Sequence, residues 1–451
     1  MKNLLAKLRQ PRRREIEAFV AWAREHAVTF DSLEGAHTNI EKLSFLDELL
    51  EDKRIVYLGE EDHWIREKNS YRLLLLRYLF PRGWRWLGEE LGWSDGMRIN
   101  RYLETGERSQ LDRVATYGYR GAIREDRDDS PTGILKESST GYPADAFAAA
   151  QIRLAESLRE LNAGRPAGSK PLCFFGFDLD VLAGGGYEEL AGILRPVLEA
   201  PAARKLKTLL TRPSGETLAQ EIARLERVLA EIDAQERQLK QLLGPDKLSL
   251  LRESALALRQ SFDFIRVANP TRSWKRLNQA MAAREEAMCR RVRFVLSRME
   301  PGDKLILMGH NRHLAKESAA IKNAGGAPPG GNKVPALGSM LNRLLPGEIF
   351  SIWMLHDCGS SSQPLSWLSS NYSSPPGSLN AILAEVGSCF LLPTASADPR
   401  ARLLRKPMQI NGIYNQVFRT AAARQADALF FVRRVNPLQI APGTKSGIED
   451  I

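Results

Sequence analysis

Short apolar runs recur along the chain, and each ends in polar or turn-forming residues. The runs are five or six residues long and rich in leucine, β-branched and aromatic side chains, a pattern typical of buried strands. The strands that this pattern predicts are residues 54–58, 84–88, 172–177, 304–308, 349–354 and 428–432.

Stretches with apolar residues three and four positions apart lie between these runs and predict amphipathic helices. The clearest of them are residues 64–80, 147–161 and 187–198. Strands that alternate with helices indicate a parallel sheet, because two parallel neighbours need a crossover connection. We therefore expect an α/β protein with a mostly parallel central sheet flanked by helices.

The composition changes between residues 202 and 300. Strand patterns are missing there, and Ala, Leu, Glu, Arg and Gln dominate at helical spacing, with a break near Gly244 and Pro245. Such a block predicts a helical insertion subdomain. The expected organisation is a first part of the α/β core with active-site loops, a helical insertion, and a second part of the core, in residues 1–200, 201–300 and 301–451.

Reactive side chains follow several of the predicted strands. The first strand is followed by Gly-Glu-Glu-Asp-His-Trp at residues 59–64, the second by Glu90, the third by Asp178, and the fourth by His310 and His313. The carboxyl ends of parallel strands open on one edge of a sheet, where α/β proteins bind ligands. We expect these loops to place imidazoles and carboxylates around one cleft.

This constellation has several interpretations. On a helix that starts at once, Glu60 and His63 share a face, and the acid orients the ring as a general base for water. The same side chains are also suited to a hydrolytic metal, although His310 and His313 lack the spacing of HExxH. An acidic helix cap beside a solvated histidine is the structural alternative. No GxSxG sequence lies beside a strand, which argues against a serine esterase.

Charge, hydropathy and cysteine spacing indicate which partners, cofactors and cellular location to expect. The net charge is +10, but Lys and Arg are spread along the chain, so no nucleic-acid partner is expected. No run reaches 18 apolar residues, so no membrane span is expected. The four cysteines form no CxxC pair, which indicates neither a zinc site nor a disulfide framework and favours a cytoplasmic location. No Walker loop or strand-linked GxGxxG occurs, so no cofactor is expected, and no oligomeric state is assigned.

The motifs of the chain resemble those of the erythromycin esterase family. The family's Gly-Glu-x-x-His, the Arg on the following helix and Glu-x-Gly-Trp are similar to LGEEDHWIREKNSYRLLLLRYL and LGEELGWSDGMRINRYL. Similar segments continue in the family's order to about residue 345, with a fainter one near 426–432. The matching residues are Gly59, Glu60, His63, Arg72, Glu90, Gly92, Trp93, Asn100, Tyr102, Asp178, Arg284, Met288, His310, Asn311 and His313.

The resemblance implies an esterase-like hydrolase with an α/β core and a helical insertion. It implies that His63 activates water against a macrolactone ester, with Glu60, Glu90 and His310 as the other catalytic residues. A neutral imidazole is suited to this role, because its pKa is near neutrality. An arginine in such a site binds the carbonyl oxygen or holds a carboxylate. The residues expected to bind substrate are Arg72, His313, Trp64, Asp178 and Arg284.

One segment departs from the family's pattern. The family usually has a small residue after the histidine, whereas this chain has Trp64, and Glu61 and Asp62 are expected to add two negative charges. We expect these residues to change the volume and field of the pocket and so to select the substrate. The expected partner is a small-molecule ester or lactone, and antibiotic inactivation is one such activity. The alternatives are a metal-dependent hydrolase on the same loops and a non-catalytic small-molecule binding protein of the same fold.

Overall fold

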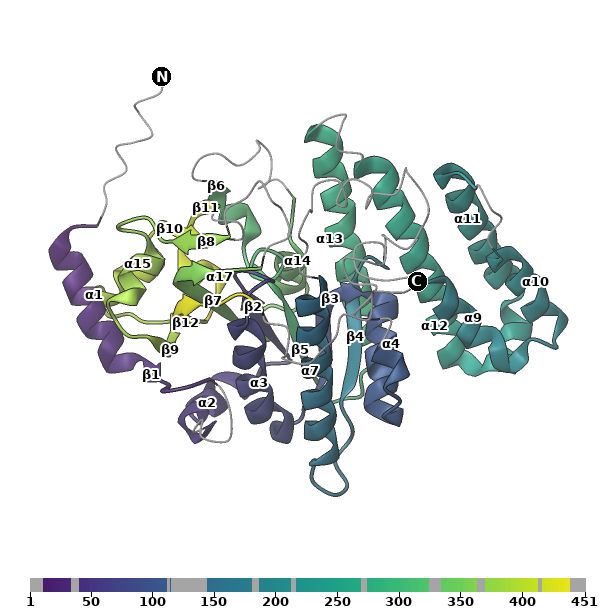
Figure 1. The fold of residues 1–451 in the computed structure, drawn as a ribbon, viewed down its shortest axis with the longest axis horizontal. Coiled ribbons are helices and arrows are strands. Elements are labelled where there is room, and N and C mark those ends of the chain that lie inside the picture. Colours follow the sequence, from purple (N-terminus) through teal and green to yellow (C-terminus); the bar gives the residue numbers. More distant parts are fainter. Residues whose placement is uncertain are drawn as a thin grey trace. The chain divides into compact units, whose positions relative to one another are not determined.

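A computed structural model describes the chain in ten segments: residues 11–33, 40–111, 114, 144–180, 186–211, 216–268, 274–323, 334–362, 370–412 and 416–438. The chain forms two compact units, whose elements are labelled in Figure 1. Unit 1 comprises residues 1–83 and 306–439, and unit 2 comprises residues 84–305 and 440–451.

Unit 1 is built on a mixed sheet with the strand order β1-β9-β12-β7-β2-β5, and β8 pairs with β7. The β12–β7 and β7–β2 pairs are parallel, whereas β1–β9, β9–β12 and β7–β8 are antiparallel. The bounds of these strands are β1 (Val28–Thr29), β2 (Ile55–Glu60), β5 (Lys304–His310), β7 (Ile349–Ser360), β8 (Asn371–Ser373), β9 (Cys389–Pro393) and β12 (Ala428–Val435).

Helices and a small second sheet complete unit 1. The small sheet is antiparallel, in the order β10-β11-β6. Its strands are β6 (Lys322–Asn323), β10 (Met408–Asn411) and β11 (Val417–Thr420). The α-helices of this unit are α1 (Arg13–His26), α2 (Leu46–Leu50), α3 (Glu67–Leu79), α14 (Leu337–Leu344), α15 (Leu379–Ala384), α16 (Arg402–Arg405) and α17 (Ala422–Gln425).

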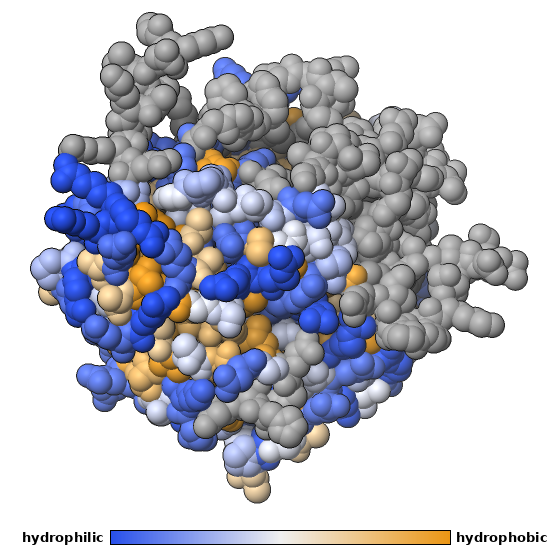
Figure 2. Space-filling model, turned by 60° about the vertical axis from the view of Figure 1, so that its left-hand side comes forward, coloured by the Kyte–Doolittle hydropathy of each residue, from blue (hydrophilic) through white to orange (hydrophobic). Residues whose placement is uncertain are grey.

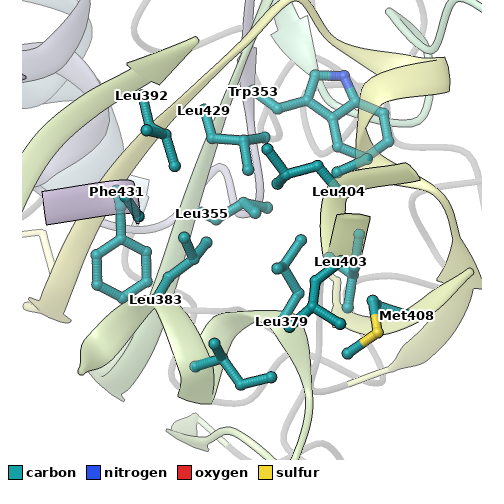
Figure 3. Packing of buried hydrophobic residues seen from close by; sticks show 14 of the residues in the cluster. Trp353, Leu355, Leu379, Leu383, Leu392, Leu403, Leu404, Met408, Leu429 and Phe431 are labelled. Atoms are coloured by element: carbon teal, nitrogen blue, oxygen red, sulfur yellow. The ribbon is translucent and has the colours of Figure 1, made fainter. Parts of the chain in front are cut away.

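The largest side chains of the unit 1 core come from elements far apart in the sequence. Trp353 and Leu355 on β7 pack with Leu429 and Phe431 on β12 and with the α15 residue Leu379 (Figure 3). Strand β2 is buried along its whole length, as expected for a strand covered on both faces. Burial of this apolar surface holds β2, and therefore the residues that follow it, in a defined position.

Unit 2 contains the parallel pair β3 (Trp84–Gly92) and β4 (Cys173–Asp178) and the helical block. Helix α4 approaches β4 very closely, because a Cβ at Gly96 would lie 1.8 Å from the nitrogen of Gly176. Helices α10, α11 and α12 extend away from the strand pair (Figure 1). The helices are α4 (Trp93–Thr105), α7 (Ala144–Ala163), α9 (Tyr187–Leu194), α10 (Pro201–Leu210), α11 (Leu218–Ala234), α12 (Glu236–Ala268) and α13 (Trp274–Leu296).

The predicted α/β class is confirmed, with parallel pairing in both units. All six predicted strands form, and Gly244 interrupts α12 with a φ of 79°, which a glycine adopts without a steric penalty. The compact units have other bounds than the three predicted segments. Residues 84–200 belong with the helical block, because β3 and β4 pair with each other and α4, α9 and α13 pack in the same unit.

The surface of the described residues is mostly polar. On the face drawn in Figure 2, hydrophilic residues cover much of the coloured area, with apolar residues between them. The large apolar side chains that are exposed among the described residues are Leu49, Leu242 and Leu344. Isolated exposed leucines are ordinary in globular proteins. Within the same described part of the chain, no helix is long and apolar enough to cross a bilayer.

The close approach of Gly176 in β4 to the end of β3 gives a stability test. A Cβ at Gly176 would lie 2.0 Å from the carbonyl oxygen of Gly92, and backbone cannot move away as a side chain can. We expect Gly176→Ala to lower the free energy of unfolding by roughly 3 kcal/mol in urea denaturation. Gly192→Ala in α9 is the control, because its Cβ would meet no atom within 4 Å. It should raise stability by at most about 1 kcal/mol; equal losses in the two variants would contradict the packing argument.

Candidate functional site

The ends of β2 and β5 define the candidate site of unit 1. These strands are neighbours in the sheet, β2 ends at Glu60, and β5 ends at His310. The backbone N–H of Asn311 donates to the carbonyl of Glu60 over 2.8 Å, which joins the two strand ends directly. The structure therefore brings together two of the loops from which the sequence predicted a site.

Gly59 is needed for this junction. A Cβ at Gly59 would lie 2.2 Å from Oδ1 of Asn311. The Asn311 amide is itself held by β7, because its Nδ2 donates to the carbonyl of Met354 over 2.9 Å. Gly59 is part of β2 and makes room for the Asn311 side chain.

The carboxylate of Glu60 lies between a histidine and an arginine. Nδ1–H of His63 donates to Oε1 of Glu60, and Nη2 of Arg72 lies 2.6 Å from Oε2. Glu60 and Arg72 are each 1% exposed, whereas the His63 side chain is 18% exposed. Arg72 comes from α3, which begins at Glu67 directly after the loop. Arg72 thus holds a carboxylate, one of the two roles expected for it.

The charges around Glu60 decide its protonation state. Burial alone would raise the pKa of this carboxyl, but Arg72, Lys68 and the hydrogen bond from His63 lower the pKa to about 2. Glu60 is therefore ionised at neutral pH. A His63 ring that donates Nδ1–H to a carboxylate carries its basic lone pair on Nε2.

His310 lies beside His63 with both ring nitrogens engaged by backbone. The two ring centroids are 5.4 Å apart. Nε2–H of His310 donates to the carbonyl of Glu61 over 3.0 Å, and the N–H of Arg312 donates to Nδ1 of His310 over 3.3 Å. The His313 ring lies 6.2 Å from that of His310 at a steep angle. The structure therefore places a row of three imidazoles at the ends of β2 and β5.

The two acids after Glu60 point into the protein, which corrects the expectation that they add two charges to a pocket. Glu61 is 1% exposed and Asp62 is completely buried. Burial raises the pKa of Glu61 well above its usual range, which disfavours the charged form of this carboxyl. Burial raises the pKa of Asp62 to about 6. Trp64 is also fully buried, and its carbonyl accepts the N–H of Ser362.

Three other predicted site residues form a cluster within unit 2. Nε and Nη2 of Arg284 lie 2.8 and 2.6 Å from the two carboxylate oxygens of Asp178, and Nη2 also lies 2.9 Å from Oε1 of Glu90. Burial alone would lower the pKa of Arg284, but Asp178 and Glu90 raise the pKa. Arg284 is thus a charged, doubly paired and partly buried guanidinium in unit 2.

Three residues around the unit 1 site were not predicted to belong to it. The amide Nδ2 of Asn380 lies 3.2 Å from Oε2 of Glu61, and the hydroxyl of Tyr372 donates to Asp62. The backbone N–H of His356 donates to Oε2 of Glu61 over 2.9 Å. His356 followed a predicted strand, which was a weak signal, whereas Asn380 and Tyr372 carried none.

The geometry favours acid–base chemistry in unit 1. An ionised carboxylate orients an imidazole that solvent reaches, and a second imidazole lies beside it. This is the arrangement of a general base and its orienting group. In the part of the chain that the structure describes, no group of three or more His, Cys, Asp or Glu side chains is placed to hold a metal ion.

An α/β fold with a carboxylate–imidazole pair at a strand end defines a class of proteins suited to hydrolysis. Within this class the chain belongs to the erythromycin esterase family, whose sequence model matches residues 81–435. The resemblance predicted from the motifs is confirmed. The matched range contains Glu90, Asp178, Arg284 and His310 and begins after His63. Family membership suggests a hydrolase.

Solved structures with the same fold share little sequence with the chain. A succinoglycan biosynthesis protein is 18% identical, with a TM-score of 0.68 over 95% of this chain and 100% of that one. A Bacillus cereus protein is 17% identical, with a TM-score of 0.69 over 94% and 99%. A histidine-to-asparagine mutant of the erythromycin esterase EreC in its open conformation is 16% identical, with a TM-score of 0.60 over 92% and 98%. Among curated protein sequences, none matches the chain.

The low pKa of Glu60 gives a pH-dependent stability test. A carboxyl with a pKa near 4.5 when unfolded and about 2 when folded stabilises the fold above pH 4.5 and loses this effect as the pH falls towards 2. The full effect is on the order of 3 kcal/mol. We expect the stability difference between wild type and Glu60→Gln to shrink as the pH of urea denaturation falls from 5 to 2. Glu48→Gln, on the exposed surface of α2, should show no such trend; a constant difference for Glu60→Gln would count against the ionised pair.

Proposed function

We propose that the protein is an ester hydrolase of the erythromycin esterase type in which His63 activates water. The observation that carries the proposal is the His63–Glu60 hydrogen bond with Arg72 on the opposite carboxylate oxygen. His63 is the member of this group that solvent reaches, so a water molecule and a substrate carbonyl have access to it. Family membership supports the assignment to hydrolases.

The reaction follows from the protonation states. Nε2 of His63 takes a proton from water while the water oxygen attacks the ester carbonyl, which forms a tetrahedral oxyanion. The imidazolium is stabilised by the ionised Glu60, which Arg72 keeps in place. When the oxyanion collapses, the C–O bond to the leaving alcohol breaks and His63 returns the proton to the alkoxide oxygen. The products are a carboxylic acid and an alcohol.

Roles for the remaining predicted residues extend the proposal. His310, beside His63, is proposed to orient the base or the attacking water. Glu90, Asp178 and Arg284 are proposed to act through their own paired cluster in unit 2, where Arg284 offers a charged group for polar parts of a substrate. Substitution of Arg284 by Lys tests this role, because Lys cannot reproduce a bidentate contact. A rise in KM without a change in fold would support it.

The proposed substrate is an ester or macrolactone, and inactivation of a macrolide is the proposed physiological activity. Two structural neighbours suggest which esters to test, since one is named an erythromycin esterase and another a succinoglycan biosynthesis protein. A panel of erythromycin, succinoglycan and simple aryl esters therefore covers the compounds that these names supply and a neutral reference. Because Trp64 is buried, its proposed effect on substrate choice is exerted through the shape of the loop.

The test is a histidine substitution in the presence and absence of a chelator. We expect His63→Ala to lower kcat by roughly 10²–10⁴-fold on any substrate that wild type turns over, with the fold retained by circular dichroism. His26→Ala, on the exposed surface of α1, should keep wild-type activity. Chelator-sensitive activity would instead favour a metal-dependent hydrolase. Binding without turnover across the panel would favour a non-catalytic binding protein.

A further inference from the structure

The acids that follow Glu60 connect the candidate site to a buried network. Glu61 reaches β7 and α15, because its carboxyl oxygen Oε2 accepts the N–H of His356 over 2.9 Å and lies 3.2 Å from Nδ2 of Asn380. The same Asn380 nitrogen donates to the carbonyl of His356 over 2.7 Å. Glu61 is therefore held by two elements that are distant in the sequence.

The His356 ring lies next to the carboxyl group of Glu61. The ring is completely buried, and within the described part of the chain neither of its nitrogens has a hydrogen-bond partner. Its Nδ1 lies 3.4 Å from Oε2 of Glu61. Burial lowers the pKa of His356 to about 3, and burial together with Asp62 and Asp357 raises the pKa of Glu61. Burial thus disfavours the charged form of both groups, and the hydrogen bonds that hold the Glu61 carboxyl come from the His356 N–H and the Asn380 amide.

The backbone of Glu61 makes the contact with the candidate site. Its carbonyl accepts Nε2–H of His310 over 3.0 Å, while the N–H of Arg312 donates to Nδ1 of the same ring. A carbonyl only accepts and a backbone N–H only donates, so these two partners select the neutral Nε2–H tautomer of His310. The ring so held lies 5.4 Å from that of His63.

We propose that Glu61 is a positioning residue: its buried side chain, held by the His356 N–H and the Asn380 amide, fixes the carbonyl that sets the tautomer and orientation of His310 beside His63. This role deepens the proposed esterase function and rests on it for its effect on the reaction. It accounts for a glutamate at this buried position, because its carboxyl oxygen accepts hydrogen bonds from the His356 N–H and the Asn380 amide.

Glu61→Gln and Glu61→Met test whether the side-chain hydrogen bonds of Glu61 fix the carbonyl that His310 contacts. Glutamine keeps an acceptor and a donor at nearly the same positions, so we expect it to keep the His310 tautomer and a kcat within about 3-fold of wild type. Methionine keeps the volume but removes both groups. We expect it to mix the His310 tautomers and to lower kcat by roughly 10–100-fold at nearly unchanged KM, because the ring beside His63 is misplaced.

The tautomer is measured without substrate. Long-range ¹H–¹⁵N spectra of the full chain with ¹⁵N-labelled histidine distinguish Nδ1–H from Nε2–H, and His310→Gln assigns the signal. Tyr372→Phe is the matched control, because it removes the hydroxyl that donates to Asp62 without touching the Glu61 contacts. It should lower stability and leave the His310 signal unchanged. A wild-type His310 in the Nδ1–H form, or an unchanged signal in a folded Glu61→Met, would overturn the proposal.

The two proposals fail in different ways. If wild type turns over no ester but Glu61→Met still shifts the His310 tautomer, the positioning role stands and the esterase function fails. If wild type is an esterase and Glu61→Gln loses as much activity as Glu61→Met, the positioning role of the Glu61 hydrogen bonds fails and the esterase function stands. Should Glu61→Met not fold, the wild-type tautomer and the glutamine variant still decide the matter.

Discussion

The buried carboxylate of Glu60 is the group on which the candidate site depends. An unpaired carboxylate at 1% exposure would be strongly destabilising, so its position requires counter-charges. Arg72 supplies one from α3, and His63 supplies a hydrogen bond from the loop that connects β2 to that helix. The pairing holds the strand end, the loop and the helix in one arrangement. It also leaves His63 with an orienting anion, which a general base needs.

Successive residues of the loop have different directions and therefore different partners. Glu60 faces His63 and Arg72, Glu61 faces β7 and α15, and Asp62 accepts hydrogen bonds from the Trp64 N–H and the Tyr372 hydroxyl. Of these three consecutive acids, Glu60 is ionised and takes part in the site. Glu61 and Asp62 anchor the loop through their buried side chains. The contacts of Glu61 and Asp62 hold the loop against the sheet, so the position of His63 does not depend on its own contacts alone.

The fold and the chemistry of the site are supported by different observations. The structural neighbours are 16–18% identical to the chain, so their likeness describes the fold. The family match and the motifs point to hydrolysis, and the contacts of Glu60 describe how His63 is oriented. In unit 2, Arg284 is paired with Asp178 and Glu90, which places two predicted carboxylates around one guanidinium.

The sequence by itself determined the α/β class, the six strands, the helical block with its break at Gly244 and the family, because these depend on local periodicity and on short motifs. It also indicated that His63, Glu60 and His310 follow strands. Only the tertiary structure decided the rest. The side chains of Glu61 and Trp64 proved to be buried, and the close approach of Asn311 explained Gly59. His356, Tyr372 and Asn380 lie roughly 300 residues along the chain from their partners, and a contact of that kind leaves no trace in local spacing.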